Sequence, residues 1–371
     1  MADSKTHLRE LSVATTVGLL KMDIDFRMDE LFCVDRLYSY AERLIENDIT
    51  TAKNILEDDI SPIELQLIVK NGYKLGLEIY KNKNFDIKQN TPIKWVGNDT
   101  QKGNPVDIII GQYGFSLKEE SFILKNMGLY QLLNTLTGSN YKKGLHVFET
   151  FAPEEYNEWF NCTWKLLLKY LNDNLGIWEE KNQLSEIRVS EDTVIMFYDR
   201  DYCNIPRDIV TINEYKKHTT SKIREKVFAK WINKEISSNE HYVKTKKACS
   251  EIAGKRVSEL IQQNFSTERM YDFFQIMEKE YYYAKTTASE TTILKVPSKE
   301  DFHKTIEFLG CRYEVPGSQL NIITTFKNKS TGKILEFRNE CRFSHGQFNG
   351  TPEAKMYVAK NTSLTNLYQP F

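Results

Sequence analysis

The chain has 371 residues and a formal net charge of −1, with 40% hydrophobic and 12% aromatic residues. This composition is too apolar for a disordered chain, and the length allows two domains or one elaborated domain with a large core. No apolar run approaches the roughly 18 residues of a membrane span, and the start of the chain lacks a signal-peptide pattern. We therefore expect a soluble, cytoplasmic protein with no membrane partner.

Cysteine and histidine residues are scattered along the chain. The six cysteines form no CxxC pair, which favours free thiols over a zinc site or a disulfide framework. The six histidines form no HExxH or H-x-E pattern, and no GxxxxGK[ST] loop is present. These absences argue against a zinc enzyme and against an NTPase.

The first half of the chain alternates between helical and extended patterns. Residues 1–60 favour an acidic helical region, and Ser61 with Pro62 predicts the start of a helix that carries Glu64 in its first turn. The strands expected next span residues 93–96, 106–110 and 115–118, with a tight turn at residues 111–114 between the last two. Further elements are expected as a helix at 121–138, a strand at 144–151, a helix at 153–172 and a strand at 193–202.

The second half begins with mostly helical patterns from about residue 211 to residue 285. Short strands then return at residues 291–296, 321–328, 333–343 and 354–359. The order of helix, strand, strand, strand, helix and strand in the first half indicates an α/β core with a mixed sheet. We place soft domain boundaries near residues 60 and 210.

Positive charge is concentrated in one segment. Between Tyr215 and Arg256 the sequence has twelve Lys and Arg against four Asp and Glu, a local balance of +8. In a nearly neutral protein this favours a polyanion-binding surface, and a solvated helical face is the alternative. The residues predicted to contact phosphates are Lys244, Lys246 and Lys247.

An apolar stretch from Gly103 to Gly128 carries charges that a buried hairpin does not need. A hairpin would place Asp107 beside Lys118, and the alternation of a strand would put Glu120 on the same face as that lysine. A lysine beside a metal ion stabilises charge that develops on a phosphate, and Mg²⁺ prefers carboxylate and carbonyl oxygens. The alternative is that these charges only solvate the end of a strand.

At this point the residues carry a resemblance to a known family. Pro105-Val106-Asp107 followed by Ser116-Leu117-Lys118 resembles the PD-(D/E)xK nuclease signature. The chain length and the polar C-terminal β region resemble type II restriction endonucleases in particular. The sequence departs from the pattern in two ways: one extra residue separates Pro105 from Asp107, and Ser116 stands where an acidic residue is expected.

The resemblance implies an α/β (α+β) fold with a mixed-sheet nuclease core at residues 61–210, flanked by helices. Residues 211–371 would form a helical basic segment and a β-rich DNA-recognition region. The implied activity is sequence-specific, Mg²⁺-dependent hydrolysis of double-stranded DNA by a homodimer, with a cognate DNA methyltransferase protecting the host. The alternatives are a non-catalytic nucleic-acid-binding protein and a repair or RNA nuclease of the same fold.

The resemblance also implies a set of site residues. The catalytic candidates are Asp107, Lys118, Glu120, Glu119 and Ser116. The candidate metal ligands are Asp107, Glu120 and Leu117. If neither glutamate after Lys118 supplies the second carboxylate, Glu78 and Glu64 on the preceding helix are more remote sources.

Base recognition is expected near the C-terminus. The segment from Arg338 to Gly350 concentrates side chains that pair with base edges, and it lies between two expected strands. Its candidate DNA-binding residues are Arg338, Arg342, His345, Gln347 and Asn349. We expect the loop to project, with Phe343 anchoring it while Arg342 faces outward; a polar hairpin turn is the alternative.

Overall fold

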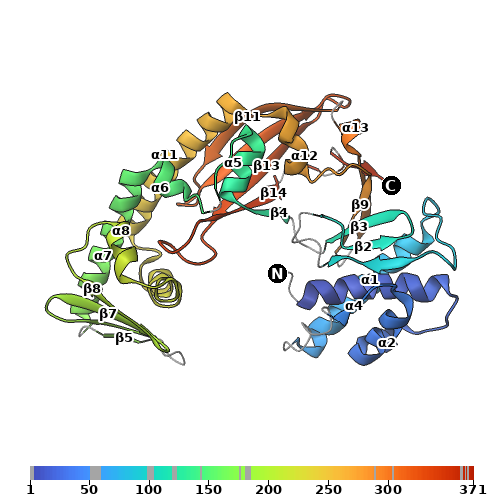
Figure 1. Cartoon of the computed structure of the whole chain (residues 1–371), viewed down its shortest axis with the longest axis horizontal. Helices are drawn as coiled ribbons and strands as arrows, with labels where there is room; N and C mark the ends of the chain where they lie inside the picture. Colours follow the sequence, from blue (N-terminus) through green and yellow to red (C-terminus); the bar gives the residue numbers. More distant parts are fainter. Residues whose placement is uncertain are drawn as a thin grey trace.

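The computed structural model describes residues 4–50, 60–97, 104–118, 123–142, 144–174, 177–179, 185–287, 290–302, 305–359, 362–363, 365 and 367–371. The described strands form three sheets, which follow one another along an elongated arch (Figure 1). The expected mixed α/β class is confirmed. A PD-(D/E)xK core within it stays a prediction.

The first sheet combines strands from both halves of the chain. In spatial order its strands are β1 (Ile93–Trp95), β2 (Ile108–Ile110), β3 (Tyr113–Lys118), β9 (Tyr281–Thr286), β10 (Thr291–Val296) and β15 (Gln369–Pro370). All neighbours are antiparallel except β3 and β9, which are parallel. The sheet is therefore mixed, as the sequence predicts.

Helices from the start of the chain cover one face of this sheet. They are η1 (Met28–Phe32), α2 (Val34–Leu44) and the long pair α1 (Ser4–Lys21) and α4 (Pro62–Lys81). Ser61 caps α4 by accepting a hydrogen bond from the Glu64 N–H at 3.4 Å, as predicted from the Ser-Pro pair. Gly72 lets α1 approach closely, because a Cβ there would lie 2.5 Å from the Ser12 Cβ.

The second sheet lies in the middle of the arch and is antiparallel. In spatial order its strands are β11 (Ile306–Glu314), β12 (Asn321–Asn328), β13 (Ile334–Arg342), β14 (Glu353–Val358) and β4 (Ile123–Gly128). The helices nearest to it are α5 (Leu129–Thr137), α6 (Val147–Phe151), α11 (Glu240–Asn264), η5 (Thr267–Arg269), α12 (Met270–Phe274) and α13 (Lys299–Phe302). Buried side chains of α5, α11 and this sheet share one apolar core.

The third sheet is an antiparallel meander at the far end of the arch (Figure 1). Its strands are β5 (Ile177–Glu179), β6 (Ser185–Val189), β7 (Thr193–Tyr198) and β8 (Asp201–Pro206). The helical segments beside it are α7 (Pro153–Asp173), α8 (Ile212–His218), α9 (Ser221–Ile223), η3 (Arg224–Phe228), α10 (Ala229–Trp231) and η4 (Ile232–Ile236). Of these, η3 and η4 have π geometry.

Several predicted elements are wrong. Residues 121–138 were expected as one helix, but β4 pairs with β14, and the helix begins only at Leu129. Tertiary strand pairing overrides the local helical pattern there. Residues 144–151 were expected as a strand but contain helix α6, capped by His146 Nδ1, which accepts from the Glu149 N–H at 3.3 Å. The aromatic run at 281–286 is strand β9 rather than helix.

Most other expected elements are confirmed, including β1, β2, β3, α4, α7 and the four C-terminal strands. Contacts cross both expected boundaries, because α1 packs on α4 and β9 completes the sheet of β3. All six cysteines are free. Within the described residues, no helix has the length and apolarity needed to cross a bilayer.

Candidate functional site

Asp107 is held by main-chain contacts on both sides. It lies directly before β2, where its N–H donates to the Phe115 carbonyl and its own carbonyl accepts from the Val96 N–H, both at 2.8 Å. Its Oδ2 accepts the Leu117 N–H at 2.6 Å. The side chain is only 5% exposed. The β2–β3 hairpin thus fixes this carboxylate beside the end of β3, as the sequence predicts.

A second buried carboxylate comes from α1. Glu10 is 1% exposed, and its Oε2 accepts a hydrogen bond from Trp95 Nε1 at 2.7 Å. The main chain at Gly97 passes directly beside it, because a Cβ at that position would overlap Glu10 Oε2. Glu10 is therefore locked between α1 and the end of β1, close to Asp107.

Asp107 makes the ionisation of Glu10 more costly. Burial raises the pKa of Glu10 to about 8, and the nearby charge of Asp107 contributes to that rise. Burial also raises the pKa of Asp107, against the lowering effect of Lys118, the Leu117 N–H and Arg9. Because like charges at short range resist joint ionisation, this pair favours a neighbouring cation. We call Glu10, Asp107 and Lys118 the acidic site.

Lys118 ends β3 and is close enough that its charge lowers the pKa of both carboxylates. In the parallel register it lies opposite Lys285 of β9. Two cations in register repel each other, so the pair favours anionic groups nearby. Ser116 is buried opposite Tyr283, and Leu117 packs with the apolar residues beneath α1, so its predicted ligand role could involve only its main chain.

The remaining acidic candidates divide into two groups. Glu119 and Glu120 lie outside the described residues. Glu64 forms an exposed ion pair with Lys5, and Glu78 is an exposed residue of α4. The acidic carboxylate that the structure brings to Asp107 is Glu10, which the sequence reasoning missed. An acidic residue on the same helical face as Ala14 and Val17 was the signal that could have identified it.

The donor set fits a hard divalent cation. Mg²⁺ is commonly held by one or two carboxylates together with waters and substrate phosphates, which is what Glu10 and Asp107 offer. Within the described part of the chain, no group of three or more His, Cys, Asp or Glu residues is placed to hold a metal. A carboxylate pair without histidine or cysteine favours Mg²⁺ over zinc.

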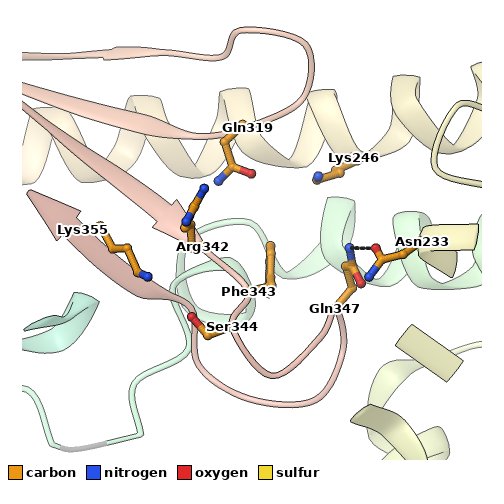
Figure 2. Close-up of a pocket in the computed structure, with 8 residues that line it drawn as sticks. All are labelled: Asn233, Lys246, Gln319, Arg342, Phe343, Ser344, Gln347 and Lys355. Carbon is orange, nitrogen blue, oxygen red and sulfur yellow. Dashed lines mark hydrogen bonds between the residues drawn. The ribbon is translucent and has the colours of Figure 1, made fainter. Parts of the chain in front are cut away.

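A second polar cluster lies on the middle sheet, at the end of β13 (Figure 2). It is a cavity of about 290 Å³ between α11, η4 and the loop of residues 343–352 that joins β13 to β14. We call it the anion pocket. Its lining residues are Asn233, Lys246, Gln319, Arg342, Phe343, Ser344, Gln347 and Lys355. It brings together Lys246 of the basic segment with Arg342 and Gln347 of the predicted recognition loop.

The other predicted DNA-binding residues do not line the anion pocket. Arg338 lies over the Tyr357 ring at 4.8 Å, and His345 Nδ1 is 3.5 Å from Glu225 Oε2. Asn349 accepts hydrogen bonds from Ser221 Oγ at 3.0 Å and Arg224 Nε at 3.1 Å, so its side chain anchors the loop. Two lysines of α11 are exposed outside the pocket: Lys244 and Lys247.

The recognition loop itself is only partly as expected. Arg342 is half-exposed, and Phe343 packs oppositely against Phe148 with ring centroids 5.3 Å apart, as predicted. The loop does not project. It folds back onto the helices, because Phe348 is fully buried and Gly346 lies against Ala229.

In comparisons with protein-family models, with curated proteins and with solved structures, no match to this chain was found.

Proposed function

We propose that the protein is a divalent-metal-dependent DNA endonuclease whose active site is the acidic site. The single observation that carries this proposal is the meeting of Glu10 and Asp107, two buried and mutually repelling carboxylates, beside Lys118. Burying two carboxylates side by side is costly even with Lys118 and Arg9 nearby, and a structural core does not require such a pair. A site for a cation and a phosphate accounts for all three groups.

The chain's own residues would divide the work. Glu10 and Asp107 would hold the ion, each oriented by a fixed donor: Trp95 Nε1 for Glu10 and the Leu117 N–H for Asp107. When bound, Mg²⁺ polarises a phosphate and lowers the pKa of an attacking water. Lys118 would place its ammonium group where negative charge develops on the phosphate oxygens.

The finer features rest on the sequence resemblance. We propose site-specific cleavage of double-stranded DNA by a homodimer, since two-fold symmetric sites are read by two-fold symmetric proteins. Such an enzyme would act alongside a cognate DNA methyltransferase that protects host DNA. The basic segment and the anion pocket support nucleic acid as the substrate, because cations facing solvent in a nearly neutral chain favour a polyanion.

The test is incubation of the full chain with phage DNA in Mg²⁺ or in EDTA. Discrete fragments that require Mg²⁺ support a site-specific nuclease, whereas a smear or structure-dependent nicks indicate a repair nuclease. Retarded but intact DNA would indicate a binding protein and contradict the proposal.

Isosteric variants then assign the site. We expect Asp107→Asn and Glu10→Gln each to reduce the cleavage rate by about 10²-fold or more while DNA binding in EDTA is retained. Glu78→Gln removes an exposed carboxylate of α4 and is the matched control. Near-normal cleavage by both site variants would sink the assignment.

A further inference from the structure

The anion pocket has a distinct charge pattern. Its three cationic residues come from three elements: Lys246 from α11, Arg342 from the end of β13 and Lys355 from β14 (Figure 2). Among the described residues that line it, none is acidic. Two carboxylates lie beside it: Glu340, whose Oε1 is 3.0 Å from Arg342 Nε, and Glu353, which is opposite Arg342 in the strand register and accepts a hydrogen bond from Ser344 Oγ at 2.6 Å. One side of the guanidinium is therefore already paired. Its remaining donors and the two ammonium groups can still bind an anion.

Lys246 is the most constrained of the three. Its Nζ lies 5.9 Å from the centroid of the Trp159 ring, and burial lowers the pKa of this lysine. Within the described residues, neither Lys246 nor Lys355 forms an ion pair. Lys355 lies opposite Glu340 in the strand register, whereas Lys246 faces the Trp159 ring. A bound phosphate would supply a counter-charge for Lys246, since Lys is a common point-charge partner of phosphate.

Amide side chains provide a second kind of contact. The Gln347 amide lies beside the Tyr242 hydroxyl, with which it forms a side-chain hydrogen bond, and its Nε2 donates to Asn233 Oδ1 at 3.2 Å. Its Oε1 is buried without a hydrogen-bond partner. Gln319 Nε2 donates to the Cys341 carbonyl, so its Oε1 remains as an acceptor. Buried acceptors without partners are costly, and a ligand that carries N–H donors would satisfy them. A phosphate alone has no such donors, whereas the edge of a nucleobase does.

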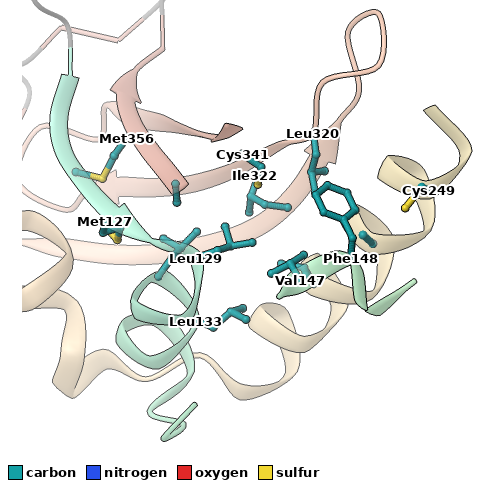
Figure 3. Packing of buried hydrophobic residues seen from close by; sticks show 14 of the residues in the cluster. Met127, Leu129, Leu133, Val147, Phe148, Cys249, Leu320, Ile322, Cys341 and Met356 are labelled. Atoms are coloured by element: carbon teal, nitrogen blue, oxygen red, sulfur yellow. The ribbon is translucent and has the colours of Figure 1, made fainter. Parts of the chain in front are cut away.

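The pocket is also rigid. Its floor, Phe343, packs between Phe148 and Trp159, with ring centroids 5.3 and 5.7 Å away. Phe148, Leu320 and Cys341 belong to one apolar core (Figure 3). In the sequence, Leu320 follows Gln319 and Cys341 precedes Arg342, so this core supports two residues of the pocket. On the far side, Asn233 is presented by the π turn η4, a geometry that is frequent at functional sites.

We propose that the anion pocket binds a single nucleotide, with the phosphate on Lys246, Arg342 and Lys355 and the base edge on the amides of Gln319, Gln347 and Asn233. The volume is near the lower limit of ligand cavities and suits one nucleotide rather than a paired segment. The nucleotide can belong to a DNA strand, displaced from its stack, or be free in solution. The DNA source rests on the proposed function; the pocket chemistry does not.

The experiment uses the full chain in EDTA, so cleavage is not required. The first arm measures binding of labelled duplexes that carry one unpaired A, C, G or T, against the fully paired duplex. The second arm measures the melting temperature with each deoxynucleoside 5′-monophosphate, against inorganic phosphate. The variants are Lys246→Met, which keeps the stem over Trp159, and Lys355→Gln and Gln347→Ala. Lys255→Gln, an exposed lysine of α11 outside the pocket, is the control.

We expect at least one unpaired base to improve binding about tenfold, the lower range for one bidentate contact, with that advantage lost in the pocket variants and kept in the control. Stabilisation by monophosphates but not by phosphate, lost in the same variants, would support the pocket with a free nucleotide as ligand. The proposal is overturned if neither probe shows a preference, if phosphate acts as well as nucleotides, or if the pocket variants match the control. If the pocket proposal is overturned but Mg²⁺-dependent cleavage is observed, the proposed function still stands. If nucleotide binding is confirmed but no Mg²⁺-dependent cleavage is observed, the pocket assignment stands without the proposed function.

Discussion

The acidic site and the anion pocket hold charge in opposite ways. In the acidic site, Glu10 of α1 and Asp107 beside β2 are buried between α1 and the first sheet and are fixed by the Trp95 and Leu117 N–H groups. In the anion pocket, the half-exposed Arg342 and the partly buried Lys246 and Lys355 lie around the Phe343 ring. Two buried carboxylates repel each other, and a bound cation would reduce that repulsion. A cluster of cationic side chains instead attracts an anion from solvent. We therefore propose the acidic site as the place of the chemical step and the anion pocket as a place where substrate binds.

The two regions belong to sheets whose strands are consecutive in the described part of the chain. β3 ends at Lys118, and the next described strand, β4, belongs to the middle sheet. There, Asn126 pairs with Lys355, a cation of the anion pocket.

The largest expected effect is on the cleavage rate, and it distinguishes Lys118 from Lys285, which lies opposite it in the strand register. Lys118→Met should lower the cleavage rate by about 10²–10³-fold with little change in DNA affinity, because a transition-state charge partner is lost. Lys285→Met removes the neighbouring cation and serves as the matched variant. Single-turnover kinetics at saturating protein give the rate. Equal losses in both variants would mean that the lysine pair binds phosphate jointly, and the specific role of Lys118 would be rejected.

A second expected effect distinguishes the regions without any cleavage assay. Millimolar Mg²⁺ should raise the melting temperature of the wild-type chain by several degrees, since a ligand at a hundred times its Kd stabilises by about 2.7 kcal/mol. Glu10→Gln and Asp107→Asn should lose this shift, whereas Lys246→Met should keep it. Scanning calorimetry provides the measurement. A shift that survives in both carboxylate variants would place the ion elsewhere.

The sequence predicted Asp107 and Lys118 of the acidic site but not Glu10. Asp107 and Lys118 are close along the chain, so a local hairpin pattern was enough to pair them. Glu10 contacts Trp95, 85 residues away, and Lys285 reaches Lys118 only through the parallel pairing of β3 with β9. Such contacts depend on topology, which local periodicity does not encode.

The fold was predictable to a similar extent. Elements with local start signals, such as Ser61 before α4, were identified correctly. β4 was missed because its strand character comes from β14, far along the chain. Lys246 and Arg342 were each predicted to contact DNA, but their meeting in one pocket follows from the packing of α11 on the middle sheet. The sequence therefore suggested the chemistry of the pocket but not its assembly.

A third expected effect tests whether the recognition loop must be rigid. Gly346 has φ +88°, and a Cβ there would overlap the Ala229 Cβ, so Gly346→Ala should destabilise the fold by about 1–3 kcal/mol and weaken DNA binding. Gly332→Ala is the matched control, with φ +71° but open space around the added Cβ. Urea unfolding and DNA titration give the two numbers. The Mg²⁺ shift should persist in both variants, and its loss in Gly346→Ala would show that the two regions are not separable.

The smallest expected effect concerns pH. His146 is buried, with Nε2 3.3 Å from the Tyr156 hydroxyl and a main-chain hydrogen bond to Gly350 at the end of the recognition loop. Burial, with a smaller contribution from the charge of Lys216, lowers the pKa of His146 to about 4, against the raising effect of the nearby Glu149. The unfolded chain, with an ordinary histidine pKa, therefore binds a proton between about pH 6.5 and 4 that the folded chain does not.

Stability should consequently fall as the pH is lowered through that window, by about 1–2 kcal/mol from this group between pH 7 and pH 5. His146→Asn keeps an N-cap acceptor for the Glu149 N–H and should flatten the pH dependence of the free energy of unfolding. His218→Asn replaces an exposed histidine of α8 and should leave the slope unchanged. An identical slope in wild type and His146→Asn would mean that this histidine does not couple the loop to pH.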